Sequence, residues 1–113
     1  MNATTRAVVA AASIAAAVNF AAPAHADPDT DFANQLHSYG IYGPRDTNAW
    51  IGKITCKRLN NHLDTDAHKS ADFLAKNLPK DSTTAQVWQF LGAAISTYCP
   101  ENMYVLQAAA QHN

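Results

Sequence analysis

The chain has 113 residues, eight basic and nine acidic side chains and a formal charge of −1 at pH 7. This length suits one domain. The charge balance gives no electrostatic footprint for nucleic acid, so we expect no nucleic-acid partner.

The first 26 residues have the features of a secretory signal peptide. Arg6 gives a positive start, an apolar run follows over 7–18, and residues 24–26 form a small-x-small cleavage sequence. A membrane anchor is the alternative, but a span needs about 20 strongly apolar residues and this run is shorter and rich in alanine. We expect cleavage between Ala26 and Asp27, no stable membrane span afterwards, and a protein that is extracellular or in the cell envelope.

Removal of 26 residues would leave a single domain of 87 residues with seven basic and nine acidic side chains, a charge of −2. So short a chain has a thin core and gains from a covalent cross-link. Cys56 and Cys99 are its two cysteines, and a disulfide between them would stabilise the fold by about 4 kcal/mol. A metal pair, a redox couple and free thiols are the alternatives, but this spacing matches neither a CxxC motif nor a zinc knuckle.

No alternating strand pattern occurs after residue 26, so we predict an all-α bundle of four or five short helices. The first helix starts at an N-cap on Asp29 or Thr30 and ends at Gly40 in the left-handed conformation. Its apolar face consists of Phe32, Leu36 and Tyr39.

The second helix is predicted over 48–59, capped by Asp46 or Thr47 and stopped at Asn60-Asn61, since asparagine tolerates positive φ. Its apolar side consists of Trp50, Ile51, Ile54 and Leu59, with Cys56 at the edge.

The third helix begins at Asp64 or Asp66 and ends before Pro79, because a residue that precedes proline leaves the α region. Phe73 lies off its apolar row and is predicted to pack sideways or to be exposed. The row consists of Ala67, Ala71, Leu74 and Leu78.

The fourth helix, about 83–98, is capped by Ser82 or Asp81, and a fifth extends over 101–110. The fourth has the broad apolar face Val87, Phe90, Leu91, Ala94, Ile95 and Tyr98, and the fifth turns Met103, Leu106 and Ala110 inward.

We predict no enzyme, no catalytic residues, no cofactor and no metal, since the chain lacks the common hydrolase, metalloprotease, phosphate-loop and dinucleotide motifs. His62 and His68 flank an acidic turn with Asp64 and Asp66, where a zinc or copper site is the alternative to exposed histidines. Haem binding is a second alternative. The candidate iron ligands are Tyr39, Tyr42, Tyr98, Tyr104, His37 and His62.

Two aromatic residues near the proline turn, Tyr42 and Trp50, offer an exposed patch for a partner or an envelope lipid. The preferred interpretation of Trp50 is a lid on the core, because it stands at a helix start. Whether Tyr98, Tyr42, Trp50 or His62 lines a binding site is left open by the sequence.

Several short segments occur in a familiar order: Asp31-Phe32, then Gly40-Ile41, then Cys56 with Leu59, then Tyr98-Cys99-Pro100. With the leader, this pattern resembles the actinobacterial, mainly mycobacterial, family of secreted proteins called domain of unknown function 732. Its members usually have a glycine shortly after the first cysteine helix, where this chain has Asn60-Asn61-His62. The resemblance supports export and the disulfide, and it implies no activity and no site residues.

Our leading functional hypothesis is a small exported, non-enzymatic and monomeric interaction module. The alternative is a carrier of a small apolar ligand or haem in a groove between helices. A deep apolar pocket would favour the carrier, and a filled core with exposed aromatic side chains would favour the module.

Overall fold

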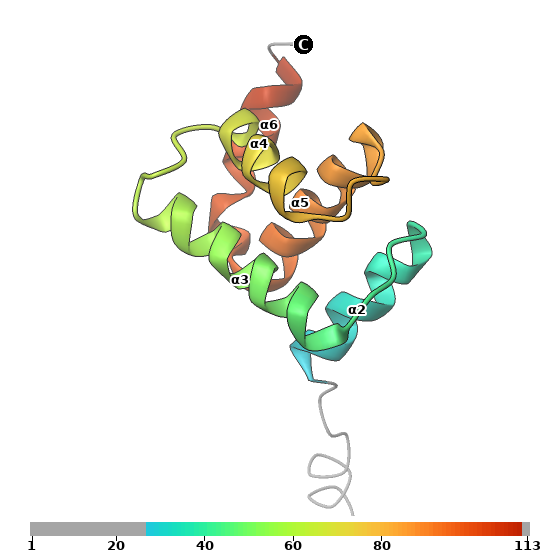
Figure 1. Ribbon diagram of the computed structural model, residues 1–113. Coiled ribbons are helices and arrows are strands. Elements are labelled where there is room, and N and C mark those ends of the chain that lie inside the picture. Colours follow the sequence, from blue (N-terminus) through green and yellow to red (C-terminus); the bar gives the residue numbers. More distant parts are fainter. Residues whose placement is uncertain (1–26, 112–113) are drawn as a thin grey trace, which may run out of the picture.

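The computed structural model describes residues 27–111, which form five α-helices and one short 3₁₀ helix, with no strand among them (Figure 1). The elements in order are α2 (Pro28–Ser38), α3 (Arg45–Asn60), α4 (Ala67–Asn77), α5 (Thr84–Tyr98), η1 (Pro100–Asn102) and α6 (Met103–Gln111). The all-α prediction is confirmed. The predicted signal peptide lies outside the described residues, and none of the described helices is long and apolar enough to span a bilayer.

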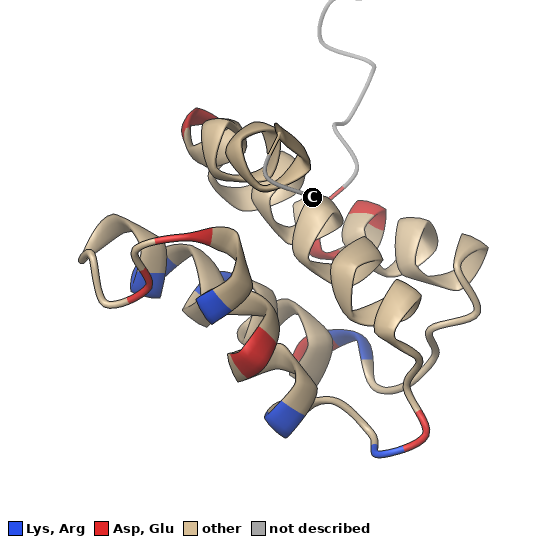
Figure 2. Ribbon diagram, turned by 90° about the horizontal axis from the view of Figure 1, so that it is seen from above, with Lys and Arg blue, Asp and Glu red and all other residues tan. Residues whose placement is uncertain are grey.

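Helices α3 and α5 form the centre of the domain. Helix α2 packs against both, α4 also packs against both, and α6 packs against α4 and α5. Figure 1 shows α2 and α6 toward opposite ends of the domain, with the α3–α4 turn standing out at its edge. Neither α5 nor α6 contains a charged residue, so the charges of the α-helices lie on α2, α3 and α4, and η1 adds Glu101 (Figure 2).

Helix α2 begins earlier than predicted. Its N-cap is Asp27, whose carboxylate accepts a hydrogen bond from the Asp29 amide at 3.4 Å, so the cap predicted at Asp29 or Thr30 is wrong. Pro28 occupies the first turn, where its fixed φ suits the helix and its missing N–H costs nothing.

The end of α2 is confirmed at Gly40, which has φ of +77°. The Gly40 amide donates to the His37 carbonyl and the Ile41 amide donates to the Leu36 carbonyl, both at 3.0 Å. These two bonds define a Schellman motif, which favours glycine at its left-handed position.

Helix α3 also begins earlier than predicted. It starts at Arg45 rather than Asn48, with Pro44 as an N-cap that offers no side-chain hydrogen bond, so neither Asp46 nor Thr47 caps it. The extended backbone of Pro44 leads directly into the helix, and Asp46 contributes instead as an acidic residue of the first turn.

The buried face of α3 is made largely of small residues. It consists of Asn48, Ala49, Ile51, Gly52, Thr55, Cys56 and Leu59. A Cβ on Gly52 would lie 3.1 Å from ring carbons of both Phe32 and Tyr98, which shows how closely the backbone approaches its neighbours. Trp50 is 65% exposed, so its predicted role as a core lid is wrong. Trp50 lies about 200° around the helix from Gly52, on the side away from Phe32 and Tyr98.

Helix α4 matches its predicted apolar face, all four residues of which are buried. Asp66 is the N-cap and accepts a hydrogen bond from the Lys69 amide at 2.9 Å, while Asp64 has a different role. Leu78 ends the helix in an extended conformation before Pro79, as predicted.

Helix α5 is capped by Thr83, not by Ser82 or Asp81. Thr83 and Gln86 form a reciprocal capping box, with hydrogen bonds of 3.0 and 2.9 Å. The Gln86 amide also donates to the Tyr39 carbonyl at 3.2 Å, which ties the start of α5 to the end of α2.

The fifth predicted helix exists, but its inward face differs. Val105 and Ala109 are buried, Met103 and Leu106 are partly buried against the core, and Ala110 is exposed. The chain enters α6 through the 3₁₀ helix η1, and the inward residues Val105 and Ala109 are four apart, one helical turn.

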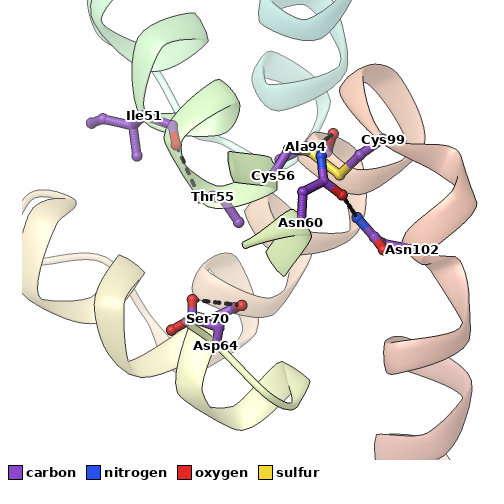
Figure 3. Close-up of a disulfide and its surroundings, with 9 residues drawn as sticks. All are labelled: Ile51, Thr55, Cys56, Asn60, Asp64, Ser70, Ala94, Cys99 and Asn102. Carbon is purple, nitrogen blue, oxygen red and sulfur yellow. Dashed lines mark hydrogen bonds between the residues drawn. A yellow bond between two sulfur atoms is a disulfide. The ribbon is translucent and has the colours of Figure 1, made fainter. Parts of the chain in front are cut away.

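The disulfide joins Cys56 on α3 to Cys99 between α5 and η1, with Cα atoms 5.8 Å apart (Figure 3). Both cysteines are buried. Beside the bridge, the Asn102 amide donates to the Asn60 side-chain carbonyl at 2.7 Å, which adds a polar tie between the same segments.

Candidate functional surface

The turn between α3 and α4 is held from inside by a buried carboxylate. Asp64 is 3% exposed and accepts hydrogen bonds from the Arg58 guanidinium at 2.9 and 3.0 Å and from the Ser70 hydroxyl at 3.0 Å. Such a bidentate pair is strong and directional. Figure 3 shows Asp64 and Ser70 facing each other below the disulfide. The turn therefore has a fixed shape.

The backbone of this turn places Leu63 in solvent. The Leu63 amide donates to the Arg58 carbonyl at 2.9 Å, and the His62 amide donates to the Leu59 carbonyl at 3.1 Å, the pattern of a second Schellman motif. His62 takes the left-handed position with φ of +59°, whereas Asn61 has φ of −91°. The expected positive φ at an asparagine is therefore wrong. Leu63 is 61% exposed.

Trp50 and Ile54 lie on the outer ridge of α3, one turn apart, and Lys57 and Asn61 continue the ridge at helical spacing. A shallow hollow of about 270 Å³ follows, lined by Ile54, Lys57, Arg58, Asn61 and Leu63.

A second hollow, of about 410 Å³, adjoins the first at Arg58 and Leu63. It is lined by Arg58, Leu63, Asp64, Lys69, Asp72, Phe73 and Lys76. The Arg58 guanidinium lies 4.3 Å from the centre of the Phe73 ring, a cation–π contact. Phe73 therefore packs sideways, as one of the two predicted alternatives stated. We call the residues of the two hollows, together with Trp50, the Leu63 surface.

Tyr98 lies in a separate polar cluster at the other end of α3. Its hydroxyl donates to Asp29 at 2.7 Å, and the Lys53 ammonium approaches the same carboxylate at 3.2 Å. The hydrogen bond from Tyr98, followed by the one from Lys53, lowers the pKa of Asp29. Burial and the neighbouring carboxylate raise the pKa of Tyr98 far above its ordinary value. Tyr98 therefore stays a neutral donor at neutral pH and ties α5 to α2.

The tyrosines and histidines considered for haem do not converge. Tyr42 contacts the His37 ring with centroids 5.2 Å apart and lines a hollow beside the α4–α5 turn. Tyr104 lines a different groove of about 330 Å³ between the start of α4 and α6, and neither Tyr98 nor His62 lines either of these two hollows.

The histidines considered for zinc or copper are also separate. Asp64 turns inward to Arg58, His62 is exposed, and His68 contacts the Trp88 ring with centroids 5.1 Å apart. Among residues 27–111, no group of three or more His, Cys, Asp or Glu side chains has the geometry to hold a metal ion.

Sequence reasoning missed Leu63 as a surface residue. The available signal was that Leu63 is the one apolar residue in the polar stretch 60–66 and belongs to none of the predicted apolar helix faces. The ion pair between Arg58 and Asp64 was also not predicted, because Asp64 lies beyond the end of the helix and periodicity does not pair residues across a turn.

A family model described as "Protein of unknown function (DUF732)" matches residues 28–101. Two uncharacterised proteins of Mycobacterium tuberculosis, MT0585 of strain CDC 1551 / Oshkosh and Rv0559c of strain H37Rv, are each 54% identical over 110 residues. Each alignment covers 96% of this chain and 97% of the relative. No solved structure matches the chain.

Proposed function

We propose that this chain, which belongs to the DUF732 family of proteins of unknown function, is a small exported, non-enzymatic module that acts by binding partners at its surface. The observation that carries the proposal is the set of large hydrophobic side chains left more than half exposed. They are Tyr42 at 67%, Trp50 at 65%, Leu63 at 61% and Tyr104 at 59%. Trp50 and Leu63 belong to the Leu63 surface, whereas Tyr42 and Tyr104 lie elsewhere. Exposed apolar groups that share one surface are typical of interaction sites.

Export is supported by the leader-like sequence before Asp27 and by the buried Cys56–Cys99 bridge. Structural disulfides form and persist in oxidising compartments outside the cytoplasm. The bridge also suits a domain this small that works without the protection of the cell interior.

A non-enzymatic role is supported by the engagement of the polar side chains that are best placed for chemistry. Asp64 is paired with Arg58 and accepts a hydrogen bond from Ser70, and the Tyr98 hydroxyl donates to Asp29. Groups occupied in this way stabilise the fold and are unavailable as a base or a nucleophile.

Native mass spectrometry of the protein recovered from the culture medium and envelope of its host tests the proposal. We expect a monomer whose chain begins at Asp27, carries one disulfide and associates with an envelope component. Retention of residues 1–26 on a cytoplasmic protein, or two free thiols in the recovered chain, would overturn it.

A carrier of a small apolar ligand is the second candidate, favoured by the groove between α4 and α6. Alanine methyl groups, Val105 and Tyr104 form most of its lining, and its volume of about 330 Å³ is at the low end for ligand sites. Visible titration with haemin at micromolar protein tests the haem version. A Soret shift that Tyr104→Ala abolishes would favour the carrier over the module.

A further inference from the structure

We propose that the Leu63 surface docks onto an anionic lipid membrane, with Trp50 and Leu63 entering the headgroup region and lysines contacting the lipid phosphates. This inference rests on the proposed function, since it names the partner class for the exported module. It concerns the outer side of α3 and the adjoining part of α4, not the groove beside α6.

The shape of the surface favours a flat partner. Trp50 stands on the outer ridge of α3, about 15 Å along the helix axis from the last residue Asn60 at 1.5 Å per residue, and Leu63 stands beyond that end. Between them lies Ile54, which is partly buried, and the hollows at either side of Leu63 are shallow. A row of protruding side chains on a convex helix matches a membrane interface, where tryptophan and leucine are favoured, better than it matches the groove-bound peptides of most receptors.

The charge of the surface is opposite to that of the rest of the domain. Its two hollows contain four cationic side chains, Lys57, Arg58, Lys69 and Lys76, against the two carboxylates Asp64 and Asp72. That leaves a local charge of +2, whereas the remaining residues from Asp27 onward hold three cationic and seven acidic side chains. The field of the domain would therefore turn this side toward an anionic surface.

Three of these cations are free to reach lipid phosphates. In the part of the chain that the structure describes, ion pairs occupy Arg45, Lys53 and Arg58, and none involves Lys57, Lys69 or Lys76. All three lysines are exposed. Their long stems allow the ammonium groups to extend past the apolar row into the headgroup layer.

Vesicle cosedimentation measures the proposed contact directly. We expect the oxidised protein, in the processed form that its host delivers, to bind vesicles of equal parts phosphatidylglycerol and phosphatidylcholine at least tenfold more tightly than vesicles of phosphatidylcholine alone. Replacement of Lys57, Lys69 and Lys76 by Gln should weaken binding about a hundredfold, since each lysine near an anionic surface contributes about fivefold. Leu63→Gln should weaken it severalfold to tenfold.

Matched controls separate this site from general stickiness. Tyr104→Ala removes an aromatic group of similar exposure from α6 and should leave vesicle binding unchanged. Tryptophan fluorescence adds a local readout, because Trp50→Phe should abolish the blue shift on vesicle addition while Trp88→Phe retains it. Circular dichroism verifies that every variant is folded.

Equal binding to both vesicle types, no binding, or equal loss in Tyr104→Ala and Leu63→Gln would overturn the membrane assignment. An exported protein that associates with a soluble partner and ignores vesicles would overturn this inference alone. A cytoplasmic protein with reduced cysteines would overturn the proposed function instead.

Discussion

Tyr98 is the residue at which several parts of the fold meet. It precedes the disulfide cysteine Cys99. Its ring packs edge-on against Phe32, with the ring centroids 5.2 Å apart, and its hydroxyl donates to Asp29 on α2. One side chain thus connects the start of the domain to the end of α5, which gives it a structural role where the sequence left its purpose open.

Tyr98→Phe should lower the free energy of unfolding by about 1–2 kcal/mol, because it removes a partly buried hydrogen bond to a carboxylate and leaves the ring packing in place. Urea unfolding at pH 7 measures this. Tyr104→Phe is the control, since its exposed hydroxyl should contribute less than about 0.5 kcal/mol. Equal losses in the two variants would contradict the assignment.

The same contact gives the stability a pH dependence with two limbs. The lowered pKa of Asp29 means that its contribution is present above about pH 4 and is lost as pH falls through the folded pKa. The raised pKa of Tyr98 means that its contribution is present below about pH 10 and is lost as pH rises beyond it. Both limbs should be shallower in Tyr98→Phe.

At the scale of elements, Schellman motifs end both α2 and α3, and the two motifs have different residues in the left-handed position. Helix α2 has Gly40 there and α3 has His62. The left-handed conformation costs a residue with a Cβ roughly 1–2 kcal/mol, and glycine does not carry this cost. The family resemblance indicates that a glycine is usual shortly after the first cysteine helix, and in this chain the residue with positive φ after that helix is His62.

His62→Gly should therefore raise the free energy of unfolding by up to about 1 kcal/mol, since the strain removed exceeds the extra chain entropy of glycine. The midpoint of urea unfolding measures the change. Asn61→Gly is the matched control: its φ of −91° requires no glycine, so that variant should be less stable than the wild type. Destabilisation by both variants would mean that the histidine side chain itself supports the turn.

The helices of this protein were predictable in number and order because their apolar residues recur at helical spacing. Three of their starts were not: the caps of α2 and α5 depend on which of several adjacent polar residues accepts a bond, as Thr83 does instead of Ser82, and α3 begins after Pro44 with no side-chain cap. The inner face of α3 was mispredicted for a different reason. Periodicity weighs large apolar side chains such as Trp50, whereas close packing around Gly52 selects small ones.

Only part of the candidate surface was predictable from the sequence, because tertiary contacts position the rest. Trp50 was named as an exposed alternative, but Leu63 is positioned by a carboxylate buried behind it, Asp64, and by a backbone motif at His62. These tertiary contacts leave no periodic trace. The disulfide was predictable because two cysteines allow one intramolecular pairing.

For the whole molecule, the bridge is the largest single contribution that can be removed without changing the surface. Loss of a cross-link that spans 43 residues should cost about 4 kcal/mol, a large share of the roughly 5–15 kcal/mol that small domains have. Thermal unfolding of the oxidised protein, the reduced protein and the Cys56→Ala/Cys99→Ala variant measures it. We expect the last two to unfold at similar, much lower temperatures, and reductant to leave the double variant unchanged. If reduction shifts the double variant as well, the reductant acts elsewhere. If the reduced wild type loses less than about 1 kcal/mol, the packing of α3 against α5 holds the domain without its covalent link.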